Sequence, residues 1–240
     1  MEISNIIKIG NRKKEHYNGL LMKADVKLHE HLTEAITAQL PKGSTILDLG
    51  AGEGALSQRL QDMGYKVIAV DINEEDFKAK SVIFKKCDFN SKDELTQLIH
   101  DNSEKFDGVL GVEVIEHLEN PWEYIRTLKS LIRPGGYIFI STPNITSWYA
   151  RLVFMMTGNF PSFINPDDCG HINPVSEWEL GVIVKKSGLN LTCVKPAGTL
   201  PYIWINSSIL KTFLNLLFLP LFPFMRGTIT GWCKIFVIKK

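Results

Sequence analysis

The sequence predicts a doubly wound α/β fold, and three consecutive features carry that prediction. Residues 46–49 form a short apolar run of the kind that a buried parallel strand shows. Three glycines follow at alternate positions, Gly50, Gly52 and Gly54. Residues 55–63 then read as a helix with Leu56, Leu60 and Met63 on one face. A strand, a tight glycine turn and a helix form the corner of a doubly wound sheet at which nucleotides bind.

Further apolar runs supply the other strands of this sheet. In addition to 46–49, we expect strands at residues 66–71, 82–89, 106–113, 137–141, 190–194 and 234–238. Together they predict a seven-stranded, mostly parallel sheet whose last strand is antiparallel. We expect one domain over residues 1–240, with insertions at about 145–175 and 200–226.

Helices are expected between these strands. Residues 25–40 carry leucine or isoleucine at every fourth position and end at a Pro-Lys-Gly turn. Pro121 begins a helix that runs to residue 132, because proline is favoured in a first helical turn. Ser176-x-x-Glu179 is a capping-box pattern, which predicts a helix from 176 to 187. Residues 1–24 are expected to be a solvated lead-in rather than a substrate lid.

The composition limits the classes of partner and compartment. The chain has 27 Lys and Arg against 26 Asp and Glu, so its charge gives no case for nucleic acid as the main partner. Its four cysteines include no Cys-x-x-Cys pair, which argues against zinc ribbons and disulfide frameworks. Residues 1–19 lack the continuous apolar core of a signal peptide. These features predict a cytoplasmic protein.

The glycine loop favours one class of cofactor. Asp48 precedes a Gly-x-Gly-x-Gly pattern, whereas the NAD fingerprint is Gly-x-Gly-x-x-Gly. The stretch Leu-Asp-Leu-Gly-Ala-Gly-Glu-Gly, residues 47–54, resembles motif I of class I S-adenosylmethionine-dependent methyltransferases. A Rossmann oxidoreductase is the alternative, and it would need a pyrophosphate-type glycine loop.

A second motif narrows the resemblance. Glu-Val-Ile-Glu-His-Leu, residues 113–118, resembles the ubiquinone-type O-methyltransferases, bacterial surface-polysaccharide methyltransferases and small-RNA 2′-O-methyltransferases. A Pro-Gly-Gly turn at 134–136, an apolar strand and Ser-Thr-Pro-Asn at 141–144 follow in the same order as in the family. The resemblance implies a Rossmann-like fold, S-adenosylmethionine as cofactor, and methyl transfer to a hydroxyl oxygen. A non-catalytic, membrane-associated binding module that keeps this fold is a further alternative.

Candidate cofactor residues lie at strand ends and in the glycine loop. Asp71 closes the strand 66–71, where a carboxylate can accept hydrogen bonds from both ribose hydroxyls or simply cap the next turn. By resemblance, Asp88 contacts the adenine amine and Phe89 lies near the ring; otherwise they are a loop aspartate and a core phenylalanine. The remaining predicted cofactor residues are Asp48, Gly50, Ala51, Gly52, Gly54, Ile72 and Glu113.

Three interpretations apply to the acidic and imidazole groups near the acceptor. By resemblance to the small-RNA enzymes, Glu113, Glu116, His117 and His171 bind a divalent cation such as Mg²⁺ or Mn²⁺. Alternatively His117 or His171 is a general base, with Glu116 beside it, because imidazole titrates near neutral pH. In the third interpretation Glu116 and His117 only cap a helix start. The sequence leaves all three open.

The two insertions bear on the acceptor. Residues 145–175 are rich in aromatic side chains and either roof the acceptor pocket, as is common in the family, or form a small satellite core. Asn144 faces the substrate or caps a loop. Residues 200–226 form a long apolar segment that Pro220 and Pro223 interrupt, so we do not expect them to span a membrane. We expect either a peripheral membrane contact or a helical hairpin that is buried against the domain or against a dimer partner. The expected acceptor is a small molecule, a glycan or a lipid-linked compound, and the peripheral contact would be at the inner face of the membrane.

Overall fold

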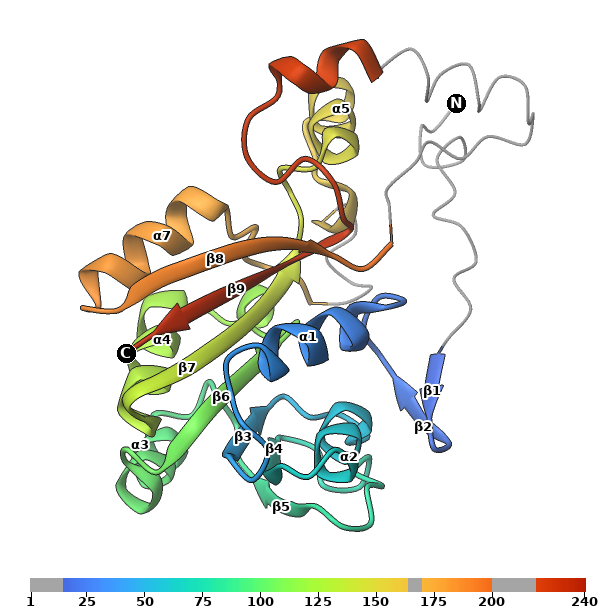
Figure 1. Ribbon diagram of the computed structural model, residues 1–240. Coiled ribbons are helices and arrows are strands. Elements are labelled where there is room, and N and C mark those ends of the chain that lie inside the picture. The colour runs from blue at the N-terminus through green and yellow to red at the C-terminus, as the bar shows by residue number, and fades with distance from the viewer. Residues whose placement is uncertain (1–14, 164–169, 200–218) are drawn as a thin grey trace.

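A computed structural model describes residues 15–163, 170–199 and 219–240 (Figure 1). The strands are β1 (Glu15–Tyr17), β2 (Leu20–Met22), β3 (Thr45–Leu49), β4 (Lys66–Asp71), β5 (Ile83–Lys86), β6 (Phe106–Val112), β7 (Ile132–Pro143), β8 (Asn190–Ala197) and β9 (Cys233–Lys239). The helices are α1 (Leu28–Thr37), α2 (Ala55–Asp62), α3 (Lys92–Asn102), α4 (Pro121–Leu131), α5 (Trp148–Thr157) and α7 (Glu177–Lys186). Short 3-10 helices are η2 (Ile115–His117), η3 (Pro161–Phe163) and η4 (Leu219–Phe224).

In the described parts of the chain, seven strands form one sheet in the order β5-β4-β3-β6-β7-β9-β8. Strand β9 runs antiparallel to both of its neighbours, β7 and β8, while the other adjacent pairs are parallel. The prediction of a mostly parallel sheet with an antiparallel last strand is therefore confirmed. The chain order reverses between β3 and β6, and ligands bind at such a switch point, beyond the carboxyl ends of the strands.

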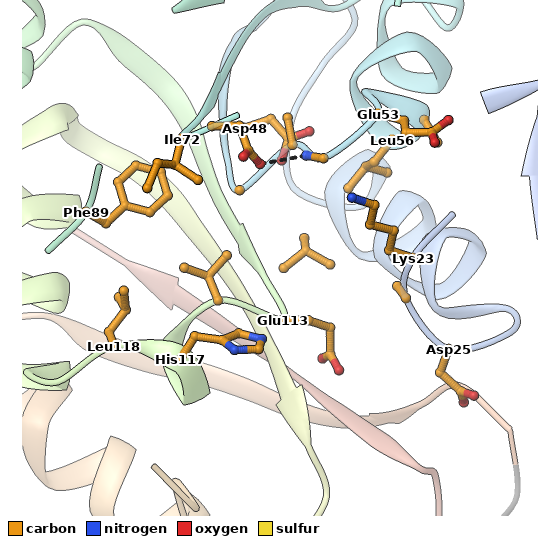
Figure 2. Close-up of a pocket in the computed structure, with 18 of the residues that line it drawn as sticks. Lys23, Asp25, Asp48, Glu53, Leu56, Ile72, Phe89, Glu113, His117 and Leu118 are labelled. Atoms are coloured by element: carbon orange, nitrogen blue, oxygen red, sulfur yellow. Dashed lines mark hydrogen bonds between the residues drawn. The ribbon is translucent and has the colours of Figure 1, made fainter. Parts of the chain in front are cut away.

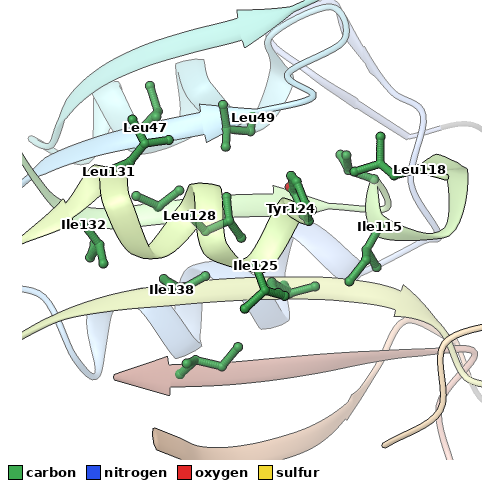
Figure 3. Close-up of a cluster of buried hydrophobic side chains, with 14 of the residues drawn as sticks. Leu47, Leu49, Ile115, Leu118, Tyr124, Ile125, Leu128, Leu131, Ile132 and Ile138 are labelled. Carbon is green, nitrogen blue, oxygen red and sulfur yellow. The ribbon is translucent and has the colours of Figure 1, made fainter. Parts of the chain in front are cut away.

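Helices cover both faces of the sheet (Figure 1). On one face, the leucines and isoleucine of α1 and Leu56 and Leu60 of α2 pack on side chains of β3, β6, β7 and β9. On the other face, α3, α4 and α7 bury their apolar sides against Leu47, Val109 and Ile138. Figure 3 shows the part of this second cluster around α4. Side chains of the central strands β3, β6 and β7 alternate between the two clusters, so these strands are buried on both faces, as in parallel sheets.

Local sequence signals set the starts of two helices. The Asn120 side chain accepts a hydrogen bond from the Glu123 N–H at 3.0 Å, and Pro121 follows in the first turn of α4. Ser176 and Glu179 make both hydrogen bonds of a capping box at the start of α7, which confirms that prediction. These caps set the residues at which α4 and α7 begin. The loop between β6 and α4 and the segment before α7 both contribute residues to the cavity described below.

The structure differs from the sequence prediction at the N-terminus and after β5. The expectation of a solvated lead-in is wrong for residues 15–22, which form the hairpin β1–β2 and bury Leu20 and Met22 beside α2; residues 1–14 lie outside the described residues. Helix α3 was not predicted. The strand expected at 82–89 ends at Lys86, so Asp88 and Phe89 lie in the loop beyond it.

The first insertion contains α5 and η3. Trp148, Tyr149 and Val153 form a small separate cluster that packs against Trp232, as the satellite-core interpretation expected. The same insertion also supplies two residues to the cavity wall, Ser162 and His171. Asn144 is buried, and its amide nitrogen donates to the carbonyls of Thr228, Thr230 and Gly231. Asn144 therefore holds the loop before β9.

The second insertion is only partly described. Residues 200–218, which carry most of the apolar stretch, lie outside the described residues. Its last part contains η4, and Phe224 there is 84% exposed. Within the described ranges, no helix has the length and apolar character that a membrane crossing requires.

Candidate active site

A cavity of about 690 Å³ lies at the carboxyl ends of β3, β4 and β6 (Figure 2). Eleven of the predicted site residues line it: Asp48, Gly50, Ala51, Gly52, Asp71, Ile72, Asp88, Phe89, Glu113, His117 and His171. Gly54 and Glu116 do not line the cavity and lie behind its wall. The switch point of the sheet thus gathers side chains that are more than a hundred residues apart in the chain.

The glycine loop turns sharply under one side of the cavity. The N–H groups of Gly50 and Ala51 donate to the Val70 carbonyl at 2.8 and 3.2 Å, which ties the loop to β4. Gly50 and Gly54 have φ of +82° and +86°. A Cβ on Gly50 would lie 2.3 Å from Val114 Cγ2, and one on Gly54 would lie 2.6 Å from Ala79 Cβ. Both positions therefore require glycine, for conformation and for space.

Two aspartates lie around this loop. The Asp71 carboxylate accepts hydrogen bonds from the N–H groups of Gly52 at 2.8 Å and Asn73 at 3.1 Å. Asp48 is buried beneath the loop and accepts a hydrogen bond from the Ser57 hydroxyl at 2.5 Å. Burial raises the pKa of Asp48 to about 6; the Ser57 bond lowers it and the nearby Asp71 charge raises it. A buried carboxyl group that binds a proton more readily than a free aspartate thus lies beneath the loop.

An apolar wall forms one end of the cavity. Figure 2 shows Ile72, Phe89 and Leu118 at this end and Lys23 and Asp25 at the other. Ile72 is 55% exposed, although isoleucine is usually buried. Apolar side chains around an open space suit a flat ring with π-faces.

The loop after β6 has an unusual backbone conformation. Glu113 has a φ of +53°, in the left-handed region that non-glycine residues rarely adopt. Ser141 stabilises it: the Glu113 N–H donates to the Ser141 hydroxyl at 3.1 Å, and that hydroxyl donates to Glu113 Oε1 at 2.8 Å. Cys233 Sγ lies 3.5 Å from Glu113 Oε2. The strained turn lets the chain bend into η2 with Glu113 facing the cavity.

Two imidazoles lie next to each other on the cavity wall. The rings of His117 and His171 meet edge to face, with centroids 4.6 Å apart. Nδ1 of His171 lies 2.9 Å from the Ser162 carbonyl, and Nδ1 of His117 lies 3.3 Å from the Gly170 carbonyl. A carbonyl only accepts hydrogen bonds, so Nδ1 carries the proton in both rings and Nε2 has the lone pair. Burial lowers the pKa of His171, and the Ser162 carbonyl partly offsets this.

Glu116 lies directly behind this pair. The N–H groups of Ile172 and Asn173 donate to its backbone carbonyl at 2.9 and 3.0 Å, which brings the segment of His171 to η2. Its carboxylate is fully buried, and neither oxygen makes a hydrogen bond of ordinary geometry among the described residues, although the Thr142 side chain lies near enough to lower the pKa of Glu116. Burial, and then the Glu113 charge, raise the pKa of Glu116 well above its usual value.

Ligand atoms of Glu116, His117 and His171 all lie within 4.8 Å of one another. One carboxylate oxygen and two imidazole nitrogens, each ring held by a backbone carbonyl, form a donor set that suits a divalent cation. The orphaned Glu116 carboxylate fits such an ion as well. Glu113, the fourth predicted ligand, lies outside this group and contacts Ser141 and Cys233 instead.

Several cavity residues had no signal in the sequence. The hairpin, the segment after it and the start of α1 contribute Leu21, Lys23, Asp25 and His29. Trp232, which comes directly before β9, also lines the cavity. None of them belongs to a motif. The pattern of α1 marks its buried leucines, and His29 is visible only as the polar neighbour of Leu28.

The fold and the cavity are those of a Rossmann-like nucleotide-binding protein. The chain belongs to the methyltransferase-domain family, because the family model described as "Methyltransferase domain" matches residues 22–194. The family is one of methyltransferases, as the resemblance implied, and not of oxidoreductases.

Curated relatives and solved structures agree with this family. The chain is 37% identical over 108 residues to the ubiquinone biosynthesis O-methyltransferase of Caulobacter vibrioides, covering 44% of this chain and 43% of that protein. It is 29% identical over 195 residues to the enzyme of that name from Xanthomonas axonopodis pv. citri, covering 75% and 76%. The chain thus covers less than half of the length of the first relative and about three quarters of the length of the second.

The fold itself is shared with solved methyltransferases. A SAM-dependent methyltransferase from Archaeoglobus fulgidus superposes with a TM-score of 0.60 at 21% identity, over 88% of this chain and 94% of that one. The magnesium protoporphyrin IX methyltransferase of Synechocystis, solved with bound SAH, superposes with a TM-score of 0.58 at 17% identity, over 88% and 81%. At these identities the likeness establishes the fold.

Proposed function

We propose that this protein transfers the methyl group of S-adenosylmethionine to a hydroxyl oxygen of a small-molecule, glycan or lipid-linked acceptor. The observation that carries the proposal is the adjacent pair His117 and His171 on the cavity wall, whose Nδ1 atoms face backbone carbonyls. An imidazole of this tautomer accepts a proton at Nε2, as deprotonation of a hydroxyl requires. The curated relatives are named as O-methyltransferases, which supports oxygen as the acceptor atom.

In this proposal the cofactor lies along the cavity with its adenine at the apolar wall. Ile72, Phe89 and Leu118 pack on the ring, and Asp88 accepts from its exocyclic amine. Asp71 accepts from the ribose hydroxyls. Glu113 and the loop of Gly50, Ala51, Gly52 and Gly54 would hold the sulfonium end of the cofactor, with Asp48 beneath the loop.

The reaction is a direct displacement at the methyl carbon. The acceptor oxygen forms a bond to that carbon, and the electron pair of the carbon–sulfur bond returns to sulfur, leaving S-adenosylhomocysteine. His117 or His171 takes the hydroxyl proton at Nε2 as the new bond forms. The sulfonium is already a good leaving group, so the protein acts by aligning the two reactants and by removing one proton.

A metal-assisted version of the same reaction is the second candidate. It is favoured by the orphaned, buried Glu116 carboxylate beside the two imidazoles. Glu116, His117 and His171 would hold the ion, and a bound Mg²⁺ or Mn²⁺ would lower the pKa of the acceptor hydroxyl and orient it. The charge of Glu116 would then be neutralised by the cation rather than by a proton.

We further propose a cytoplasmic protein that contacts the inner membrane face through its insertions. Support comes from exposed apolar side chains of α5 and η4: Phe154, Met155, Met156 and Phe224. In Figure 1 these two elements lie near each other, at the end of the molecule away from β5. Apolar side chains flanked by Arg226 suit a lipid–water interface. A homodimer formed through the same face is the alternative. The contact is predicted on residues 200–226, of which 200–218 lie outside the described residues.

The acceptor can be found by comparing cells that lack the gene with complemented cells. Untargeted mass spectrometry of polar, glycan and lipid extracts should detect a compound that gains one methyl group only when the gene is present. Complementation with a His117→Ala and His171→Ala double variant should not restore it. Identical extracts from deletion and complemented cells would contradict the proposal.

A further inference from the structure

The cavity wall around the paired histidines offers lone pairs rather than protons to a ligand. We call it the histidine wall, and its described members are Glu113, His117, Pro143, Ser162, His171 and Trp232. In both imidazoles Nδ1 donates its proton to a backbone carbonyl, so the other ring nitrogen, Nε2, can only accept. A polar group that binds here must therefore donate a hydrogen bond, as a hydroxyl or an ammonium does.

Glu113 adds a fixed negative charge to the histidine wall. Its Oε1 accepts a hydrogen bond from the Ser141 hydroxyl at 2.8 Å, and its Oε2 lies 3.5 Å from Cys233 Sγ. Burial, and then the Glu113 charge, raise the pKa of Cys233 well above its usual value, so the thiol stays protonated and can donate. Neither of these two partners is positive. They hold the carboxylate in place without neutralising it.

No lysine or arginine belongs to the histidine wall among the residues that the structure describes. Lys23 is the one such residue in the described lining of the whole cavity, and its Nζ pairs with Asp76 at 3.1 Å. Figure 2 shows Lys23 next to Leu56 and away from His117. Glu116 is buried behind the rings, with a carboxylate oxygen within 4.8 Å of a nitrogen of each. The described groups at this wall are thus neutral or acidic.

An acidic group on a ligand would meet both features of this wall. A carboxylate or phosphate brings only hydrogen-bond acceptors, so it would face the imidazole lone pairs and the Glu113 charge after losing its water. Such a juxtaposition of like charges is a means by which proteins reject a wrong ligand. A neutral hydroxyl or an ammonium, by contrast, can donate to each of these groups.

We propose that the acceptor unit which enters the cavity is an uncharged or basic hydroxyl compound, and that Glu113 is the residue that rejects acidic ones. This inference rests on the proposed methyl transfer to oxygen and narrows its acceptor. It excludes hydroxy-carboxylates, uronic acids and phosphorylated sugars as the methylated unit, and it leaves neutral sugars, amino sugars, phenols and alcohols. A phosphate on a carrier that stays outside the cavity does not meet Glu113.

The first test measures the charge of the methylated unit. The full chain transfers an isotope-labelled methyl group from S-adenosylmethionine to an extract of cells that lack the gene. Mild acid hydrolysis releases methylated units from any lipid diphosphate carrier, and ion exchange separates them into acidic, neutral and basic fractions. We expect the label in the neutral or basic fraction, with roughly a tenth or less in the acidic one.

The second test measures the charge at the wall without any acceptor. Iodide, caesium and acrylamide quench tryptophan fluorescence as an anion, a cation and a neutral molecule. The difference between each protein and its Trp232→Phe counterpart isolates the signal of Trp232 in the wall. With EDTA and S-adenosylhomocysteine present, and relative to free tryptophan, caesium should quench this signal roughly threefold more efficiently than iodide. Acrylamide reports whether a substitution has changed access to the ring.

Two matched variants assign the charge to its source. Glu113→Gln keeps the shape of the side chain and should remove most of the preference for caesium. Glu34→Gln removes an exposed acid of α1 outside the cavity and should leave that preference unchanged.

The two tests fail in different ways. Wild-type label mainly in the acidic fraction overturns the inference, and so does iodide quenching of Trp232 as efficient as that by caesium. A preference for caesium that persists in Glu113→Gln overturns the role of Glu113. An extract in which no fraction is labelled contradicts the proposed methyl transfer itself, whereas the quenching result still decides the charge of the wall.

Discussion

The carboxylate of Asp71 lies 2.8 Å from the backbone N–H of Gly52 and accepts its hydrogen bond. One side chain at the end of β4 thereby holds the glycine loop that follows β3. The neighbouring strands are in register, with Leu49 beside Val70, so their ends meet at one edge of the sheet. The loop and the predicted ribose ligand are thus parts of a single hydrogen-bonded unit.

This relationship makes Asp71 a strong test of the cofactor pose. Asp71→Ala should weaken S-adenosylmethionine binding by about 1–3 kcal/mol, because a charged partner of the ribose is lost. Calorimetry on the folded variant measures this, with Asp93→Ala on the exposed start of α3 as the matched control. An unchanged affinity in Asp71→Ala would show that the carboxylate does not bind the ribose.

Asp48 should make the stability of the empty protein depend on pH. Its pKa is about 6 when folded, above the ordinary 3.8, so the folded state binds more protons between these values. The free energy of unfolding should therefore fall as pH rises from about 4 to 6, by roughly 3 kcal/mol from this residue. The isosteric Asp48→Asn can still accept from Ser57 and should lack this component.

Urea unfolding of both proteins across this range checks the effect. The stability of the wild type relative to Asp48→Asn should decline with rising pH and level off above pH 6. If the difference in free energy of unfolding between the two proteins stays constant from pH 4 to 7, folding does not raise the pKa of Asp48, because other interactions offset its burial.

Much of the sheet could be predicted because its strands are buried on both faces. Residues 46–49, apart from Asp48, and residues 67–70 are apolar, and each strand ends where the apolar residues stop. The polar residue that ends each run, such as Asp71 or Glu113, is then placed at the ligand edge by topology alone. This is why the cofactor loop was visible in the sequence.

The remaining elements depend on contacts that the sequence does not display. Strands β1 and β2 have three residues each and exist because Leu20 and Met22 pack beside α2. Helix α3 buries only Leu95, Leu98 and Asn102, so its apolar face is too narrow to stand out. Lys23 and His29 reach the cavity only through these tertiary contacts, and no motif marks them.

The exposed apolar side chains predict attachment to lipid. Intact protein should float with neutral or anionic liposomes, and changing Met155, Met156 and Phe224 to Ser should reduce the floating fraction, because each removes exposed apolar surface. Ile83→Ser is the control, since Ile83 is 63% exposed on β5 at the other end of the molecule. Monodisperse protein that stays wholly soluble with both liposome types would make this surface a contact between subunits or with another protein.

The paired histidines should affect turnover rather than cofactor binding. His171→Ala or His117→Ala should lower kcat roughly 100- to 10,000-fold and leave the affinity for S-adenosylmethionine unchanged, as expected when a general base is lost. Treatment with EDTA should leave the wild-type rate intact. A rate that EDTA abolishes and Mg²⁺ or Mn²⁺ restores would favour the metal-assisted version, whereas full activity in both variants would contradict a catalytic role altogether.

Methyl transfer to oxygen can be measured most directly with purified protein and a cofactor whose methyl group carries carbon-13. The protein is incubated with extract from cells that lack the gene, and the labelled product is analysed by nuclear magnetic resonance. We expect one enzyme-dependent signal with the chemical shift of a methyl ether, absent with the His117→Ala and His171→Ala double variant. A labelled methyl group on nitrogen, carbon or sulfur, or no labelled product in any extract, would contradict the account.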